Sequence, residues 1–138
     1  MSPTILDAGP LVAYLDKRDQ HHAWSVAEFR NLTVPLITCE PVLTEACFLL
    51  KDLPAAISRI QFWLSRGIIR VAFSLAVQHD RVFALMEKYR SVPMSLADAC
   101  LVCMAENAGD SRVFTADTDF GIYRLNRRRI VLRISPTE

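Results

Sequence analysis

The sequence predicts an α/β fold with a mostly parallel sheet and helices on both faces of that sheet. Short apolar stretches rich in β-branched residues alternate with longer stretches in which apolar residues recur at helical spacing. Parallel neighbouring strands need a crossover, and the crossover is normally a helix. The chain has 138 residues, the usual length of one domain, so we expect a single domain over residues 1–138.

Five strand candidates follow one another along the chain, and each is only a few residues long. They cover residues 4–7, 34–38, 68–73, 112–117 and 129–134. Short apolar runs of this kind suit strands that are buried on both faces of a parallel sheet.

Six helix candidates account for most of the remaining chain. They cover residues 9–17, 22–31, 39–51, 54–66, 75–90 and 95–108. Pro10 and Pro54 fall in expected first turns, where the missing N–H of proline removes no helical hydrogen bond. Gly67 and Gly109 follow expected helix ends, where glycine is a favourable terminator.

Composition is typical of a globular protein and excludes several other classes. Hydrophobic residues make up 51% and charged residues 22% of the chain, which excludes a disordered protein. We find neither a membrane-spanning apolar run nor a secretory signal, so we expect a cytoplasmic protein with no membrane partner. The four cysteines are then expected to stay reduced. Cys100 and Cys103 form a C-x-x-C inside a helical pattern, which favours buried helix residues over zinc or redox chemistry.

Five acidic residues can face the carboxyl edge of the predicted sheet, where open parallel sheets bind their ligands. Asp7 ends the first strand, and Asp117 and Asp119 end the fourth. Glu45 lies early in the helix after the second strand, and Asp98 lies in the first turn of the last helix.

Most of these acids also have a structural interpretation. Asp7 can cap the helix that follows it. Ser95 and Asp98 fit a capping box, in which two side chains satisfy backbone N–H groups at a helix start. Asp117 and Asp119 can form the turn after a strand.

A cluster of the five acids would need a cation, because neighbouring carboxylates repel one another. Glu45 strengthens this interpretation, since its helix is apolar on most sides and a carboxylate there is rarely without a partner. None of the three lysines lies at a predicted strand end. Carboxylate and water oxygens suit Mg²⁺ or Mn²⁺, and no His or Cys spacing indicates zinc. Such an ion can activate water and neutralise a phosphoryl group, which predicts hydrolysis of a phosphate ester.

An arginine-rich segment lies near the C-terminus of a chain whose net charge is only +1. It contains Arg124, Arg127, Arg128, Arg129 and Arg133. The planar guanidinium donates two hydrogen bonds to one oxyanion, so the segment is a candidate phosphate contact. A solvated turn accounts for the same pattern.

The acidic segments resemble, in order and spacing, the four motifs of the PIN-domain ribonucleases, especially the VapC-type toxins of prokaryotic toxin–antitoxin pairs. The segments are ILDAGPLVAYLDKRDQHHAW, VLTEACFLL, SLADACLV and VFTADTDF. The resemblance covers nearly the whole chain. It implies a three-layer α/β/α sandwich with a sheet of about five mostly parallel strands.

The resemblance also implies a Mg²⁺- or Mn²⁺-dependent endoribonuclease. It maps the acids of the family onto Asp7, Glu45, Asp98 and Asp117, with Asp119 as an additional carboxylate, and none of the four core positions is substituted. Asp7, Asp98 and either Asp117 or Asp119 would bind metal directly or through water. Glu45 would hold a metal-bound water or a second ion.

The substrate implied by the resemblance is RNA, and the implied partners are a second copy of the chain and a cognate antitoxin. The antitoxin would insert a basic side chain or a C-terminal segment into the acidic groove. We expect Thr115 to hydrogen-bond an acid or the substrate. The expected contacts with the RNA backbone are Arg124, Arg127, Arg128 and Arg129.

Two other functions remain open from the sequence. A Mg²⁺-dependent phosphatase or phospho-accepting domain can use a similar sheet, although such domains generally need a lysine near a late strand end, and none is present. A non-catalytic interaction module could instead use the acids to bind the arginines of a partner.

Overall fold

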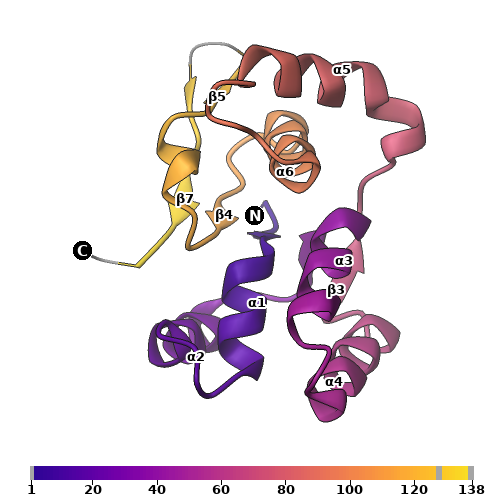
Figure 1. Ribbon diagram of the computed structural model, residues 1–138, viewed down its shortest axis with the longest axis vertical. Helices are drawn as coiled ribbons and strands as arrows, with labels where there is room; N and C mark the ends of the chain where they lie inside the picture. The colour runs from indigo at the N-terminus through magenta and orange to yellow at the C-terminus, as the bar shows by residue number, and fades with distance from the viewer. Residues whose placement is uncertain (1, 127–128, 137–138) are drawn as a thin grey trace.

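In the described part of the chain, a sheet of five parallel strands forms the middle layer (Figure 1). The computed structural model describes residues 2–126 and 129–136. The strands of this sheet are β1 (Ile5–Leu6), β2 (Leu36–Thr38), β3 (Ile69–Val71), β4 (Val113–Phe114) and β7 (Arg133–Ile134). They lie in the order β3-β2-β1-β4-β7, and each neighbouring pair is parallel. The expected mostly parallel sheet is confirmed.

The helices of the described residues form the two outer layers. They are α1 (Ala8–Leu15), α2 (His22–Asn31), α3 (Glu40–Leu49), α4 (Pro54–Ser65), α5 (Leu75–Lys88) and α6 (Leu96–Asn107). The chain moves outward from β1 to β3 through α1 to α4, then returns to β4 through α5 and α6. Right-handed crossovers in opposite directions place these two groups of helices on opposite faces of the sheet. Figure 1 shows α5 and α6 on one side of the strands and α1 to α4 on the other, which confirms the α/β/α sandwich.

Local sequence signals account for several of the helix boundaries, which lie within two residues of the expected ones. Pro54 begins α4, where it costs no hydrogen bond. Ser95 and Asp98 form the expected capping box at the start of α6. Gly67 and Gly109 adopt φ values of +72° and +68° just after α4 and α6, a backbone conformation that glycine takes at little cost.

The segment 129–134 contains two strands, and its assignment to a single strand was wrong. Its first part, β6 (Arg129–Ile130), pairs antiparallel with β5 (Arg124–Leu125), and only β7 joins the central sheet. Asn126 begins the turn of this hairpin at φ +48°, a left-handed conformation that asparagine tolerates. Its N–H donates to a carboxylate oxygen of Glu106 at 2.6 Å, so α6 holds the turn in place.

The core lies between the sheet and the two helical layers. The side chains of β1 and β4 are completely buried, and α6 is buried over most of its length. Cys100 and Cys103 are buried free thiols of α6, as expected, and the Cys103 thiol donates to the side-chain carbonyl of Gln78 at 3.1 Å. Over residues 2–126 and 129–136, no helix combines the length and apolar content needed to cross a bilayer.

Candidate functional site

The candidate site lies at the carboxyl ends of β1 and β4, where the strand order of the sheet reverses. The next two strands in the sequence, β2 and β3, extend the sheet on one side of β1, and β4 lies on the other side. The backbone N–H of Asp7 donates to the carbonyl of Phe114 at 3.0 Å, so the ends of these two strands are adjacent. Open parallel sheets bind their ligands in such a crevice.

Asp7 is buried at this crevice, with an exposed fraction of 7%. One carboxylate oxygen accepts the N–H of Ala8 at 2.7 Å, and the other accepts the hydroxyl of Thr115 at 2.7 Å. Burial raises the pKa of Asp7 from 3.8 to about 7 in spite of these two hydrogen bonds, and the negative charges of Asp98 and Glu45 raise it further. The charged form of Asp7 is therefore costly unless a cation compensates it.

Thr115 connects the acids at the ends of the two strands. Its hydroxyl donates to Asp7 and accepts the backbone N–H of Asp117 at 2.9 Å. Asp117 in turn accepts the N–H of Asp119 at 2.8 Å, at the start of the 3₁₀ helix η1 (Thr118–Gly121). A continuous series of hydrogen bonds thus fixes Asp7 relative to the loop that carries Asp117 and Asp119.

Asp98 lies half-buried in the first turn of α6. Its Oδ2 atom accepts the backbone N–H of Ser95 at 3.3 Å and the hydroxyl of Tyr123 at 3.2 Å. Burial raises the pKa of Asp98, and the nearby charge of Asp117 raises it as well. Asp98 and Asp117 therefore lie within electrostatic range of each other. Tyr123 was missed by the sequence reasoning, because nothing in its spacing relates it to an acid 25 residues earlier.

Glu45 lies on the exposed surface of α3, and no hydrogen bond or ion pair connects its side chain to another described residue. Its expected partner, a divalent ion or a water bound to that ion, remains a prediction, because the exposed carboxylate has no protein partner among the described residues. Its charge still contributes to the pKa of Asp7, so it lies within electrostatic range of that acid. An open groove of about 910 Å³ lies beside Glu45, and its lining includes Phe48, Phe73 and Leu96.

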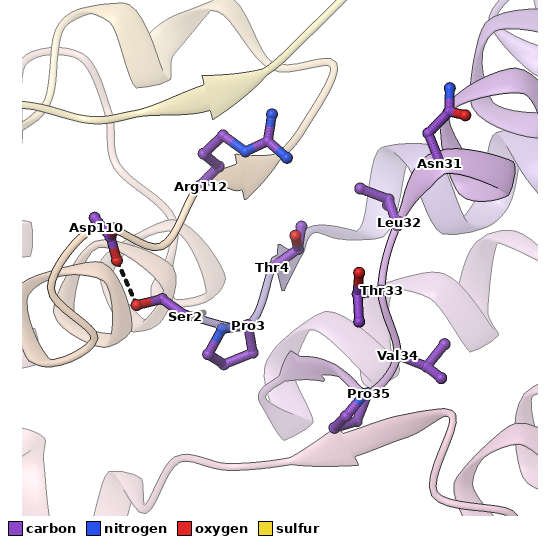
Figure 2. Close-up of a pocket in the computed structure, with 10 residues that line it drawn as sticks. All are labelled: Ser2, Pro3, Thr4, Asn31, Leu32, Thr33, Val34, Pro35, Asp110 and Arg112. Atoms are coloured by element: carbon purple, nitrogen blue, oxygen red, sulfur yellow. Dashed lines mark hydrogen bonds between the residues drawn. The ribbon is translucent and has the colours of Figure 1, made fainter.

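A different cavity lies at the opposite edge of the same strands (Figure 2). Its volume is about 320 Å³, and its lining includes Thr4, Pro35 and Arg112, which directly precede β1, β2 and β4. The hydroxyl of Ser2 donates to the carboxylate of Asp110 at its wall. This cavity lies at the amino ends of the strands and is separate from the candidate site.

The structure places Arg129 away from the acids. This residue lines a small cavity together with Gly109 and Asp110, which follow the C-terminal end of α6. Asp98 lies at the other end of α6, and the 12 residues of that helix span about 18 Å. Arg127 and Arg128, also expected to contact substrate, lie outside the described residues.

Two arginines lie beside η1, the turn that carries Asp119. Arg124 donates through Nη1 to three carbonyl oxygens in this region, including that of Gly121 at 2.7 Å. The guanidinium of Arg133 also lies against Gly121, where an added Cβ would come within 3.2 Å of Nη1. Arg133 was not predicted as a site residue, although it belongs to the arginine-rich segment that the sequence singles out.

The sequence profile of the PIN domain matches residues 4–125. The chain belongs to the PIN domain family. PIN domains are typically nucleases that bind RNA, and they generally use divalent metals such as Mg²⁺. The comparison with curated proteins finds no match. The matched range contains all five candidate acids of this PIN domain and ends before Arg127.

The donor groups of this PIN domain suit a hard, partly hydrated divalent ion. Asp7, Asp98 and Asp117 offer carboxylate oxygens, and none of them forms an ion pair with a basic side chain of the described residues. Within residues 2–126 and 129–136, no three His, Cys, Asp or Glu side chains converge closely enough to bind one ion together. Mg²⁺ usually takes one or two carboxylates and keeps several waters, which agrees with this open arrangement.

Proposed function

We propose that this PIN domain is a Mg²⁺- or Mn²⁺-dependent endoribonuclease and the VapC-type toxin of a toxin–antitoxin pair. The main support is the position of Asp7, which is buried at the switch point of the sheet and has a pKa of about 7 beside other acids. A buried carboxylate among like charges gains most from a bound cation. Family membership agrees with this nuclease function and does not favour the phosphatase or phospho-accepting alternative.

Each acid has a role that follows from its surroundings. Asp7 and Asp117, connected through Thr115, would hold the ion, and Oδ1 of Asp98 would contact it through a bound water. The ion, when bound, lowers the pKa of a water and neutralises charge on the scissile phosphate. Glu45 is free to orient the attacking water or accept its proton, because its side chain reaches solvent. Asp119 is the additional carboxylate of the group.

RNA is the proposed substrate, and its phosphates would be bound by the arginines next to the acids. Arg124 and Arg133 both lie beside Gly121 in η1, so they can contact a phosphate next to the cleaved one. Arg129 lies about one helix length away, where it can contact only a more distant part of a longer RNA. Contacts from Arg127 and Arg128 remain predictions.

The proposed protein partners are a second copy of the chain and a cognate antitoxin. Phe48 on α3 and Val77 and Phe83 on α5 are 65%, 78% and 55% exposed, which favours burial of these helices against another protein. The acids lack a basic partner among the described residues, so a basic side chain of an antitoxin could pair with them and inhibit the enzyme.

The function is tested by incubating metal-free and Mg²⁺-supplemented protein with a panel of structured RNAs and resolving the products on a sequencing gel. We expect discrete internal cuts only with the metal present, and none with Asp7→Asn. The matched control is Asp52→Asn, which removes an exposed acid between α3 and α4. Metal-dependent cleavage that survives in Asp7→Asn would refute the site, and a wild-type protein that cuts no RNA would refute the activity.

A further inference from the structure

Tyr123 is a buried tyrosine whose hydroxyl contacts an acid of the candidate site. Its side chain is 0% exposed, and its hydroxyl donates to Oδ2 of Asp98 at 3.2 Å. Burial raises the pKa of Tyr123, and the negative charges of Asp98 and Asp119 raise it further, so the hydroxyl keeps its proton and acts as a donor.

Aromatic packing fixes the position of this hydroxyl. The Tyr123 ring lies edge-on to the rings of Tyr89 and Phe120, at centroid distances of 5.1 and 5.2 Å. The backbone N–H of Arg124 donates to the hydroxyl of Tyr89 at 3.0 Å, which ties the neighbouring ring to the same stretch of backbone. A buried tyrosine held in this way cannot turn toward water to find another acceptor.

The two oxygens of Asp98 have different surroundings as a result. Oδ2 accepts two hydrogen bonds, one from the N–H of Ser95 and one from Tyr123. Oδ1 accepts none from the residues that the structure describes. The N–H of Ser95 belongs to the capping box and would be present at any helix start of this type. The contact from Tyr123 is additional, and it comes from the segment that follows the loop carrying Asp117 and Asp119.

We propose that Tyr123 is a positioning residue, whose hydroxyl holds Oδ2 of Asp98 so that Oδ1 is presented to the divalent ion. This inference rests on the proposed function, because it assumes that the acids bind a metal. A hydrogen-bond donor behind a metal-binding carboxylate fixes its orientation, and removing such a partner typically lowers metal affinity 10- to 100-fold.

The test compares Tyr123→Phe with Tyr89→Phe. Each substitution removes one buried hydroxyl from the same aromatic group, but only the hydroxyl of Tyr123 contacts an acid. Mn²⁺ alone is titrated into the full chain by isothermal calorimetry, and thermal unfolding of the metal-free proteins is measured in parallel. We expect Tyr123→Phe to lower Mn²⁺ affinity about tenfold or more and Tyr89→Phe to leave it unchanged.

Asp98→Asn provides a second variant that separates the proposed contact from a general loss of packing. In the Asp98→Asn background, Tyr123→Phe should cause no further loss of Mn²⁺ affinity, because its partner is already altered. A further tenfold loss in that background would overturn the inference, and so would equal losses in Tyr123→Phe and Tyr89→Phe.

The remaining outcomes distinguish the inference from the function on which it rests. Wild-type affinity in Tyr123→Phe would overturn the role of the tyrosine and leave the metal site intact. A wild-type protein that takes up no Mn²⁺ would overturn both.

Discussion

Asp7 should make the metal-free protein less stable as the pH rises. The ordinary pKa of an aspartate carboxyl is 3.8, whereas the pKa of Asp7 is about 7 in the folded protein, where only 7% of the residue is exposed. The unfolded chain therefore releases this proton near pH 4, and the folded chain releases it near pH 7. Between these values the folded state binds more protons than the unfolded state, so the free energy of unfolding falls as the pH rises.

The gap between the two pKa values corresponds to about 4 kcal/mol. This stability is fully present below the unfolded pKa and is lost as the pH rises through the folded pKa. Asp7→Asn keeps a side chain that can accept the N–H of Ala8, since asparagine is as good a helix cap as aspartate. An altered contact between residue 7 and Thr115 changes the free energy of unfolding by an amount that does not vary with pH. We therefore expect the free energy of unfolding of Asp7→Asn, measured relative to wild type, to increase by about 4 kcal/mol as the pH rises from about 4 to about 8.

Urea unfolding in the presence of a chelator measures this difference. Trp24 packs edge-on to Phe114 of β4 at a centroid distance of 5.1 Å, so tryptophan fluorescence reports the integrity of the core. Saturating Mn²⁺ at the higher pH should restore stability to wild type and not to Asp7→Asn, because a ligand that binds only the folded state stabilises it. Wild-type and variant stabilities that change in parallel with pH would refute the assignment of a desolvated charge to Asp7.

Three further substitutions probe other contacts. Thr115→Val removes a hydrogen bond that lowers the pKa of Asp7. We therefore expect the decrease in the free energy of unfolding to extend to a higher pH, and we expect less RNA cleavage on the gel. Glu106→Gln disrupts the paired hydrogen bonds from Arg81 at 2.6 and 2.8 Å, and we expect a loss of about 2 kcal/mol in urea unfolding. Arg133→Ser should weaken RNA binding and reduce the slope of log affinity against log salt by about 1.

Each of these substitutions has a reference or a matched control in the chain. For Thr115→Val, the reference is wild type, and cleavage at the wild-type rate would contradict the role of this hydroxyl. For Glu106→Gln, the control is Glu87→Gln, which breaks an exposed ion pair with Arg90 and should cost less than about 1 kcal/mol. For Arg133→Ser, the control is Arg129→Ser, and a larger effect from Arg129 would place the bound RNA at the other end of α6.

Sequence patterns predict the parallel sheet and the helices because the signals that define them are local. Prolines in first turns, the capping box and two glycines define several of the helix ends. The division of residues 129–134 into two strands depends on a contact outside the segment. Glu106 accepts the N–H of Asn126 and holds the hairpin turn against α6, a tertiary contact across 20 residues. β-branched residues suit a hairpin or a parallel strand equally well, so the segment itself does not specify the choice.

The candidate site shows the same distinction between local and tertiary signals. Asp7 and Asp117 follow buried strands directly, so their positions at the sheet edge are predictable from the chain order. The contact between Tyr123 and Asp98 depends on how the segment after η1 packs against α6, which no spacing rule encodes. The separation of Arg129 from the acids likewise depends on the hairpin, although the arginines are close together in the sequence.

The structural and functional interpretations of the acids are compatible in this fold. Asp7, Asp98 and Asp117 each accept a backbone N–H at the start of a helix or 3₁₀ turn, where the helix dipole also favours negative charge. These contacts partly offset the repulsion between the carboxylates that lie at this edge of the sheet. Glu45 has no such contact with the described residues and stays exposed to water instead. Substitution by asparagine should therefore remove the charge and keep the cap, whereas alanine would remove both and confound loss of activity with loss of fold.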